Sequence, residues 1–261
     1  MASEDQDPAR LRASAFIRQG EERMRRRWFG SLTRWMDRVR PDVVTEDALS
    51  PQNIAQHSAY WGRLMEDEVV PESASLYARV RNRITGRRDP VTDPEAAAYL
   101  NEVGNRLSNI PNEVYALVVR EIERGVAQGD GIPAMADRVR GVLTTAGAPY
   151  WQNRAVTVAR TETMAAVNAG AYAGALRDAT ERGDPAPFKV WLATEDTRTR
   201  PTHREADKQR TLLSEPFRVG GAQLLYPGDP RGPAGEVINC RCTFLPVTLG
   251  ETLDWTDRQD P

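Results

Sequence analysis

Three side chains in the C-terminal third of the chain, those of His203, Cys240 and Cys242, are of the types that bind metals. The two cysteines are the only ones in the 261 residues and stand one residue apart in the stretch INCRCTF. We interpret residues 235–247 as a β-strand, in which alternation places both thiols on one face, about 7 Å apart. His203 lies in the polar run EDTRTRPTHREAD, directly after a strand that we expect at 188–194. If the two strands pair, this run lies over the cysteine end of the sheet.

The sequence allows three interpretations of this group. Thiolate and imidazole are both zinc ligands, so the histidine and the two cysteines could bind that metal, with Asp196 or Asp207 as a candidate fourth ligand. The C-x-C spacing differs from the usual C-x2–4-C of zinc sites, and we favour buried thiols beside a structural histidine. Apart from this zinc, no cofactor is expected. Catalysis by a thiol with His203 is the third interpretation, but the chain has no nucleophile loop such as G-x-S-x-G. The other histidine, His57, is expected to be a packing or surface residue.

A long helix predicted at 149–180 has one acidic residue within an apolar stripe. Eight positions advance by alternating four and three residues, and the only charged one is Glu162. An unpaired buried carboxylate costs roughly several kcal/mol, so it needs a cation or several donors beside it. Arg198 and Arg200 either are exposed to solvent, or one of them pairs with Glu162 and joins the helix to the sheet. Alanine and glycine dominate the same helix, which lets another backbone approach closely. The stripe consists of Trp151, Ala155, Val158, Glu162, Ala165, Ala169, Tyr172 and Leu176.

The other elements follow from hydrophobic spacing, helix caps and prolines. The fold class is predicted as α+β, with a mainly helical N-terminal two-thirds followed by a small C-terminal α+β unit with a short β-sheet. A proline-containing stretch at 86–94 has the composition of a linker. Further helices are expected at 12–40, 53–69, 94–107, 110–129 and 131–143. The expected parts of the chain are an N-terminal helical arm at 1–90, a helical part at 91–182, a small α+β part at 183–250 and a C-terminal tail at 251–261.

The composition argues against some classes of protein. No apolar run approaches the ~20 residues that span a bilayer, so we expect no membrane partner, and the N-terminus lacks a signal-peptide core. Two cysteines are too few to stabilise a chain of this size by disulfide bonds, so we expect the protein in a reducing compartment. The net charge of −2 gives no general reason to bind DNA. Residues 10–40 nevertheless contain ten arginines against three acids. The run RMRRRWF within them could bind DNA, an acidic partner or a neighbouring subunit. The alternative is an amphipathic helix with a solvated basic face.

Three separate motifs in the C-terminal half resemble a known family. They are NRAVTVARTETMAAVNAGAYAGA at 153–175, KVWLATEDTRTRPTH at 189–203 and PGDPRGPAGEVINCRC at 227–242. In order, spacing and identity they resemble the Mu F-like family of phage head morphogenesis proteins, over about 105–247. The structural signature residues that this resemblance assigns are Arg160, Glu162, Asn168, Trp191, Asp196, Arg198, Arg200 and Asn239, beside His203, Cys240 and Cys242. One departure is the sequence EADKQ after the histidine, where family members often have a D-G-Q-like turn.

The resemblance implies a non-enzymatic minor capsid protein, with 91–182 and 183–250 as two parts of one Mu F-like domain. Such a protein is expected inside the phage head near the portal, and in the host cytoplasm during assembly. Its expected partners are the portal protein, the major capsid or scaffolding protein, and packaged double-stranded DNA, through roles in head assembly, DNA packaging or ejection. The candidate portal- or DNA-binding residues are Arg23, Arg25, Arg26, Arg27 and Trp28.

Two other functions remain open from the sequence. One is an enzyme, either a capsid maturation protease or a metal-dependent hydrolase, that uses His203 with Cys240 and Cys242. The other is a DNA-binding module, which only the local basic segments support.

Overall fold

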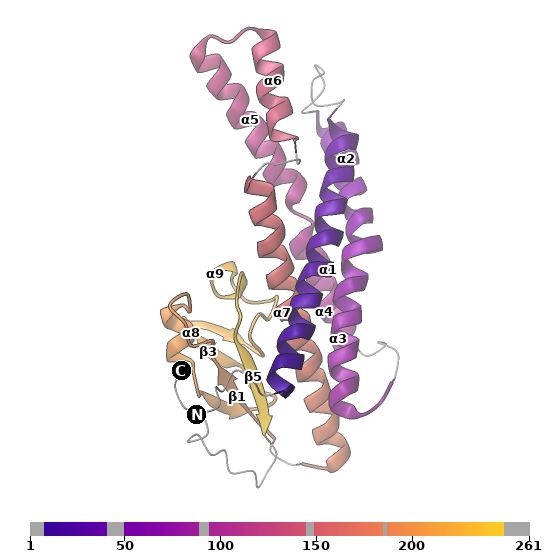
Figure 1. Cartoon of the computed structure of the whole chain (residues 1–261), viewed down its shortest axis with the longest axis vertical. Coiled ribbons are helices and arrows are strands. Elements are labelled where there is room, and N and C mark those ends of the chain that lie inside the picture. The colour runs from indigo at the N-terminus through magenta and orange to yellow at the C-terminus, as the bar shows by residue number, and fades with distance from the viewer. Residues whose placement is uncertain (1–7, 41–49, 89–93, 145–148, 185–186, 248–261) are drawn as a thin grey trace.

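The protein consists of a helical bundle beside a small α+β unit (Figure 1), which confirms the predicted α+β class. The computed structural model describes residues 8–40, 50–88, 94–144, 149–184 and 187–247. The bundle contains α1 (Pro8–Val39), α2 (Pro51–Leu64), a π-helical turn (Met65–Val69), α3 (Val70–Thr85), α4 (Pro94–Leu107), α5 (Ile110–Gln128), α6 (Ile132–Val142) and α7 (Pro149–Arg182). Within these described ranges, no helix is both long and apolar enough to cross a lipid bilayer.

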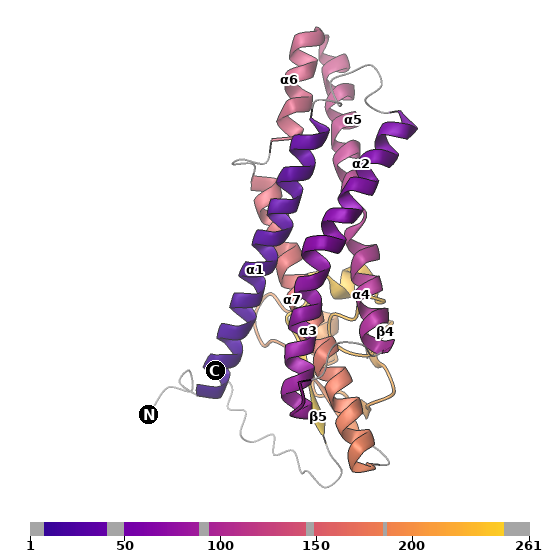
Figure 2. The ribbon, with the colours of Figure 1, turned by 90° about the vertical axis from the view of Figure 1, so that its right-hand side faces the viewer.

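Helix α7 is the element on which the rest of the bundle packs. Helices α1 and α3 lie along it in both views (Figures 1 and 2). A Cβ atom on Gly170 would overlap the carbonyl oxygen of Tyr77 in α3, and one on Gly174 would lie 3.0 Å from the Cβ of Ile84. This confirms the prediction that the alanine- and glycine-rich helix lets another backbone approach closely.

The apolar stripe of α7 faces the core as predicted, but its acidic residue has a different partner. Seven of the eight positions are buried and the eighth is partly buried. Glu162 is 1% exposed, and Arg106 of α4 donates two hydrogen bonds to its carboxylate, at 3.0 and 2.6 Å. The predicted pairing with Arg198 or Arg200 is wrong, because Arg198 is exposed and Arg200 donates to the carbonyl oxygen of Ile238. The ion pair therefore joins two helices of the bundle.

Residues 51–85 form one continuous run of helix, which the sequence patterns predict only as far as residue 69. Helix α2 passes through the π-helical turn into α3, and Val70 N–H bonds to the carbonyl oxygen of Met65, five residues back. Pro71 has no N–H to donate and its ring conflicts with the preceding turn of a regular α-helix. The wider π turn accommodates this proline. Pro71, which follows the predicted helix at 53–69, therefore lies inside continuous helix.

The C-terminal unit holds two small antiparallel sheets beside α7. Strand β1 lies between β2 and β5, with Trp191 of β1 opposite Phe244 of β5, and β3 and β4 form a separate hairpin. The first and last strands of this unit, whose pairing the sequence left open, therefore pair with each other. The elements are β1 (Phe188–Leu192), α8 (Pro201–Glu205), β2 (Arg210–Leu212), β3 (Phe217–Val219), β4 (Ala222–Leu224), α9 (Ala234–Val237) and β5 (Thr243–Val247).

The tryptophan of the basic segment lies inside the bundle. Trp28 of α1 is 0% exposed, and its ring packs edge to face against Trp61 with 6.2 Å between ring centroids. Its predicted role in portal or DNA binding is therefore corrected, because a fully buried indole cannot contact a partner. The described part of the expected arm at 1–90 lies against α7 and shares its core. The division of the chain into domains stays a prediction.

The four arginines of the same segment have different surroundings. Arg23 pairs with Glu72 of α3 at 2.7 Å, which helps to hold α1 against α3. Arg25 and Arg26 share an acidic residue one turn earlier in their own helix. Arg27 is exposed. A partner-binding role of these four arginines stays a prediction.

Replacing Arg106 with alanine is expected to lower the free energy of unfolding by about 3 kcal/mol, because the buried carboxylate of Glu162 then has no cation beside it. Arg198→Ala is the matched control. The Arg198 side chain is 71% exposed, so this change should stay within about 0.5 kcal/mol. Urea unfolding of both variants gives the two values, and equal losses would contradict the assigned ion pair.

Gly170→Ala is expected to lower the free energy of unfolding by about 2 kcal/mol, because α3 must move away from α7 to make room for the methyl group. Gly104, a partly exposed residue in the middle of α4, has open space where a Cβ would lie. Gly104→Ala should therefore stabilise the protein, by up to about 1 kcal/mol, through helix propensity alone. Thermal unfolding should show shifts of opposite sign, and a Gly170→Ala protein as stable as the wild type would argue against this close packing.

Candidate functional site

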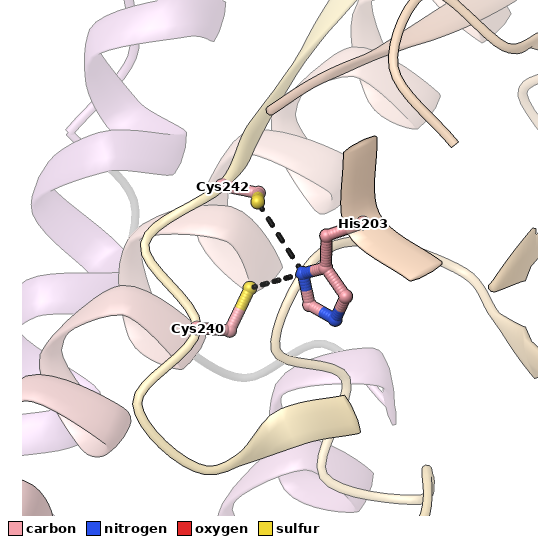
Figure 3. A group of neighbouring side chains, drawn as sticks. All are labelled: His203, Cys240 and Cys242. Carbon is pink, nitrogen blue, oxygen red and sulfur yellow. Dashed lines mark hydrogen bonds between the residues drawn. The ribbon is translucent and has the colours of Figure 1, made fainter. Parts of the chain in front are cut away.

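His203, Cys240 and Cys242 meet in the interior of the C-terminal unit (Figure 3). Their ligand atoms lie within 4.8 Å of one another, and each residue is at most 2% exposed. Nδ1 of His203 lies 3.4 Å from Sγ of Cys242 and 3.7 Å from Sγ of Cys240. The structure therefore brings together the three residues that the sequence singles out as ligands, and their use as metal ligands stays a prediction.

The two cysteines reach His203 from a loop. The predicted strand at 235–247 is wrong over most of its length, because α9 and a loop precede β5, which begins at Thr243. Asn239 has a φ of 59°, a left-handed conformation that turns the chain between α9 and the cysteines. The thiols converge on the histidine because of this turn, and strand alternation has no part in it.

Polar side chains of α7 hold this loop in place. Thr161 Oγ1 accepts a hydrogen bond from the backbone N–H of Asn239 at 3.0 Å. Asn168 Nδ2 donates to the carbonyl oxygen of Cys242 at 3.0 Å and to a second carbonyl oxygen at 2.9 Å. Arg160 Nη1 lies 3.5 Å from the side-chain oxygen of Asn239. Arg160, Asn168 and Asn239 belong to the predicted structural signature, whereas Thr161 was not identified from the sequence.

His203 is oriented by contacts on two sides of its ring. Its Nε2 lies 3.0 Å from Oε2 of Glu236, and the same carboxylate oxygen accepts a hydrogen bond from the Thr202 hydroxyl at 2.9 Å. Trp191, a predicted signature residue, packs edge-on against the imidazole with 5.5 Å between centroids. Nδ1 is thereby left to face the two sulfur atoms. Glu236 was not identified from the sequence, where its only signal is its position four residues before Cys240.

The two thiols differ in acidity. The hydrogen bond from the Cys240 thiol lowers the pKa of Cys242 to about 5, and the adjacent His203 adds to the effect. The same hydrogen bond, together with burial, raises the pKa of Cys240. Of the two sulfur atoms, that of Cys242 therefore carries a negative charge more readily.

The two candidate fourth ligands have other partners. Asp196 accepts two hydrogen bonds from the Arg241 guanidinium, one of them at 2.7 Å, and this cation holds the pKa of Asp196 well below its usual range. Asp207 accepts a hydrogen bond from the backbone N–H of Ala193 at 2.8 Å. Among the described residues, neither carboxylate belongs to the group of ligand atoms around His203. The proposal of an aspartate as fourth ligand is therefore corrected.

A small hollow adjoins the cluster. Its volume is about 10 Å³, which is room for about one water molecule. The cluster residues line it together with Thr194, Thr199 and Arg241. Arg200 lies at its edge and donates to the loop carbonyl of Ile238. The hollow offers space beside the ligand atoms for a solvent molecule but not for a side chain of a substrate.

A buried lysine in the same unit was not identified from the sequence. Lys189 on β1 is 0% exposed, and its Nζ donates to the carbonyl oxygens of Leu213 at 2.9 Å and Leu225 at 2.8 Å. The rings of Tyr172 and Phe217 lie 4.9 and 5.0 Å from it. Burial lowers the pKa of Lys189 to about 7, which nearby carboxylates oppose. The only sequence feature that could have marked Lys189 is its residue type, because just two of the 35 basic residues are lysines.

The lysine predicts a pH dependence of stability. The pKa of Lys189 is about 7 in the folded protein and about 10.4 in an unfolded chain. Between these values the unfolded chain binds more protons, so the free energy of unfolding rises with pH, by up to about 1.4 kcal/mol per unit. Below about pH 7 both states are protonated and this contribution is constant. In urea unfolding measured at a series of pH values, Lys189→Met should reduce the rise of the free energy of unfolding with pH. Lys208→Met, at an exposed position, should leave this rise unchanged. An unchanged slope in Lys189→Met would contradict the assignment.

Comparison with known proteins gives one family and two relatives. Residues 117–245 match the family described as phage Mu protein F like protein. NAD(+)–arginine ADP-ribosyltransferase EFV of Enterococcus faecalis is 32% identical over 148 residues, which are 57% of this chain and 29% of that protein. Minor head protein GP7 of Bacillus phage SPP1 is 28% identical over 203 residues, which are 72% of this chain and 61% of that protein. The match therefore spans less than two thirds of either relative. No solved structure gave a significant match.

The matched range begins within α5 and ends in β5, so it includes α7 and the whole buried cluster. The three sequence motifs of the predicted resemblance lie within the same range. Residues 117–245 therefore match the phage Mu protein F-like family, which is the family that the three motifs predict.

Proposed function

We propose that the protein is a non-catalytic minor head protein of a tailed phage, bound to the portal inside the head and acting in head assembly, DNA packaging or ejection. The observation that carries this proposal is the extent of the match to a minor head protein. That match covers 72% of the chain, whereas residues 117–245 are about half of it. Since only residues 246–261 follow the family range, the likeness also extends upstream of it.

The packing of the bundle supports the same proposal. Helices α1 and α3 lie along α7 and share its core, so the part upstream of the family range is built onto the family domain. The match to the minor head protein, which includes residues upstream of the family range, therefore covers helices that pack together in one structural unit. The match to the ADP-ribosyltransferase covers only 29% of that enzyme, which leaves its named activity without assigned residues in this chain.

The surroundings of the cluster favour a non-catalytic role over a protease or hydrolase. The hollow beside His203 and the cysteines has a volume of about 10 Å³, far below the roughly 300 Å³ of small-molecule sites. The nearby charged groups are engaged with the protein itself, Asp196 with Arg241 and Arg200 with a loop carbonyl. A substrate would therefore have to displace structural contacts before it reached a thiol.

The exposed arginines of α1 are the proposed contact with the portal. Arg27, Arg34 and Arg38 are exposed and stand seven and four residues apart, which places them on one side of the helix. Arg26 is exposed beside them. Such a basic surface fits an acidic patch of a protein partner and would give the complex a salt-dependent association rate. The alternative occupant of this surface is packaged DNA.

Charge reversal tests the proposed contact. The double variant Arg26→Glu and Arg27→Glu should weaken co-purification with the portal protein of the same phage by about tenfold or more, since like charges then meet across the interface. The matched control is Arg83→Glu with Arg204→Glu, two exposed arginines on α3 and α8. The control should co-purify as the wild type does.

Three results would contradict parts of this proposal. If the wild-type protein does not co-purify with the portal and is missing from finished heads, the head role is wrong. If both double variants behave alike, α1 is not the contact. If the wild-type chain retains duplex DNA at physiological salt and the α1 variant does not, the surface faces DNA.

A further inference from the structure

Two sulfur atoms lie beside the same ring nitrogen of His203. Glu236 is the partner of Nε2, so in the neutral ring Nε2 carries the proton and Nδ1 has one lone pair. The two sulfur atoms face this lone pair, at 3.4 and 3.7 Å, and all three side chains are buried (Figure 3).

The spacing between the nitrogen and each sulfur atom is that of ligands around one metal ion. A tetrahedral zinc ion bonds sulfur at about 2.3 Å and nitrogen at about 2.0 Å, which separates the two kinds of ligand atom by about 3.5 Å. The two observed nitrogen-to-sulfur distances lie on either side of this value. We infer that Nδ1 of His203 and the Sγ atoms of Cys240 and Cys242 bind one Zn²⁺ ion.

The contact on the far side of the imidazole supports the same assignment. A histidine that binds a metal through one nitrogen usually donates its other N–H to a carboxylate, which fixes the ring and raises its basicity. Glu236 has this position, and the Thr202 hydroxyl fixes the carboxylate in turn. Glu236 is therefore a positioning residue, while the ligands are the histidine and the two thiolates.

The donor set selects the metal and leaves one position to solvent. Two sulfurs and one imidazole form a soft set that suits zinc better than magnesium or calcium. The hollow of about 10 Å³ that the three ligands line has room for a water molecule as the fourth ligand. Two thiolates balance the charge of the ion, so the buried site has no net charge to be desolvated.

The site joins two segments that are far apart in the sequence. His203 lies on α8 and the cysteines lie 37 and 39 residues later, in the loop held by α7. A metal bond between these segments acts as a cross-link within the C-terminal unit, and its binding free energy adds to the stability of the folded state. This role is independent of the proposed function in the phage head.

Metal analysis of the purified full-length chain is the first test. We expect close to one zinc per chain after gel filtration, and one equivalent of Co²⁺ should replace it in protein stripped by a chelator. Bound cobalt should show the intense absorption of thiolate-to-cobalt charge transfer, which reports sulfur ligands in the wild-type chain. Chelation should also lower the Tm, and added zinc should restore it.

Variants then assign the ligands. Cys240→Ser with Cys242→Ser should remove the metal, and Glu236→Gln should keep one zinc at saturation but weaken its affinity by about 10- to 100-fold in competition with a chelator. Asp196→Asn is the matched control and should bind zinc as the wild type does. Circular dichroism shows whether each variant retains the helical bundle.

Three outcomes would overturn the site. They are a wild-type chain that takes up no zinc even when titrated in its reduced form, a Cys240–Cys242 disulfide in freshly purified protein with no free thiol, and a double-serine variant that still binds one equivalent.

Discussion

Helix α7 has to bury most of its circumference, and the arrangement of the other elements follows from that constraint. A helix surrounded in this way needs small side chains where neighbouring backbones cross it. Gly170 and Gly174 provide this space toward α3, and the turn at Gly228 of the C-terminal unit comes within contact of Ala165 on another side. Bundle and C-terminal unit thus use different faces of the same helix, and neither could keep its packing if α7 were moved.

Burying a helix on several sides leaves its polar side chains without water, so each needs a partner in the protein. Glu162 receives a bidentate hydrogen bond from Arg106, which ties α4 to α7. The side chains of Thr161 and Asn168 form hydrogen bonds with the backbone of the loop before β5. The polar residues of α7 therefore connect the helical part of the chain to the buried cluster. The cluster geometry depends on the bundle even though the cluster residues all lie outside it.

Features of the fold that depend on a single helix could be predicted from the sequence. The spacing of apolar residues identifies α7 and its buried face, and small residues identify the close packing. The sequence could not name the partner of Glu162, because helical spacing tells which face is buried but not which arginine lies across it. The cysteines were placed on a strand by alternation, whereas Asn239 adopts a left-handed conformation that no pattern in the sequence marks. His203 and the thiols were grouped correctly by their chemistry, while their geometry depends on contacts from α7.

The interior position of the cluster also limits where a partner can bind. His203, the cysteines and Trp191 are enclosed, and the hollow beside them holds little more than a water molecule. Residues that are enclosed in this way stabilise the domain and leave recognition to its outer surfaces. Among the described elements, α5 and α6 extend beyond the rest of the bundle at the end away from the C-terminal unit (Figure 1), and Val126 there is 69% exposed. The exposed arginines of α1 lie along the flank of the same bundle. A family domain with a buried signature can therefore serve different partners, because its outer helices can change without disturbing the contacts that α7 and the cluster require.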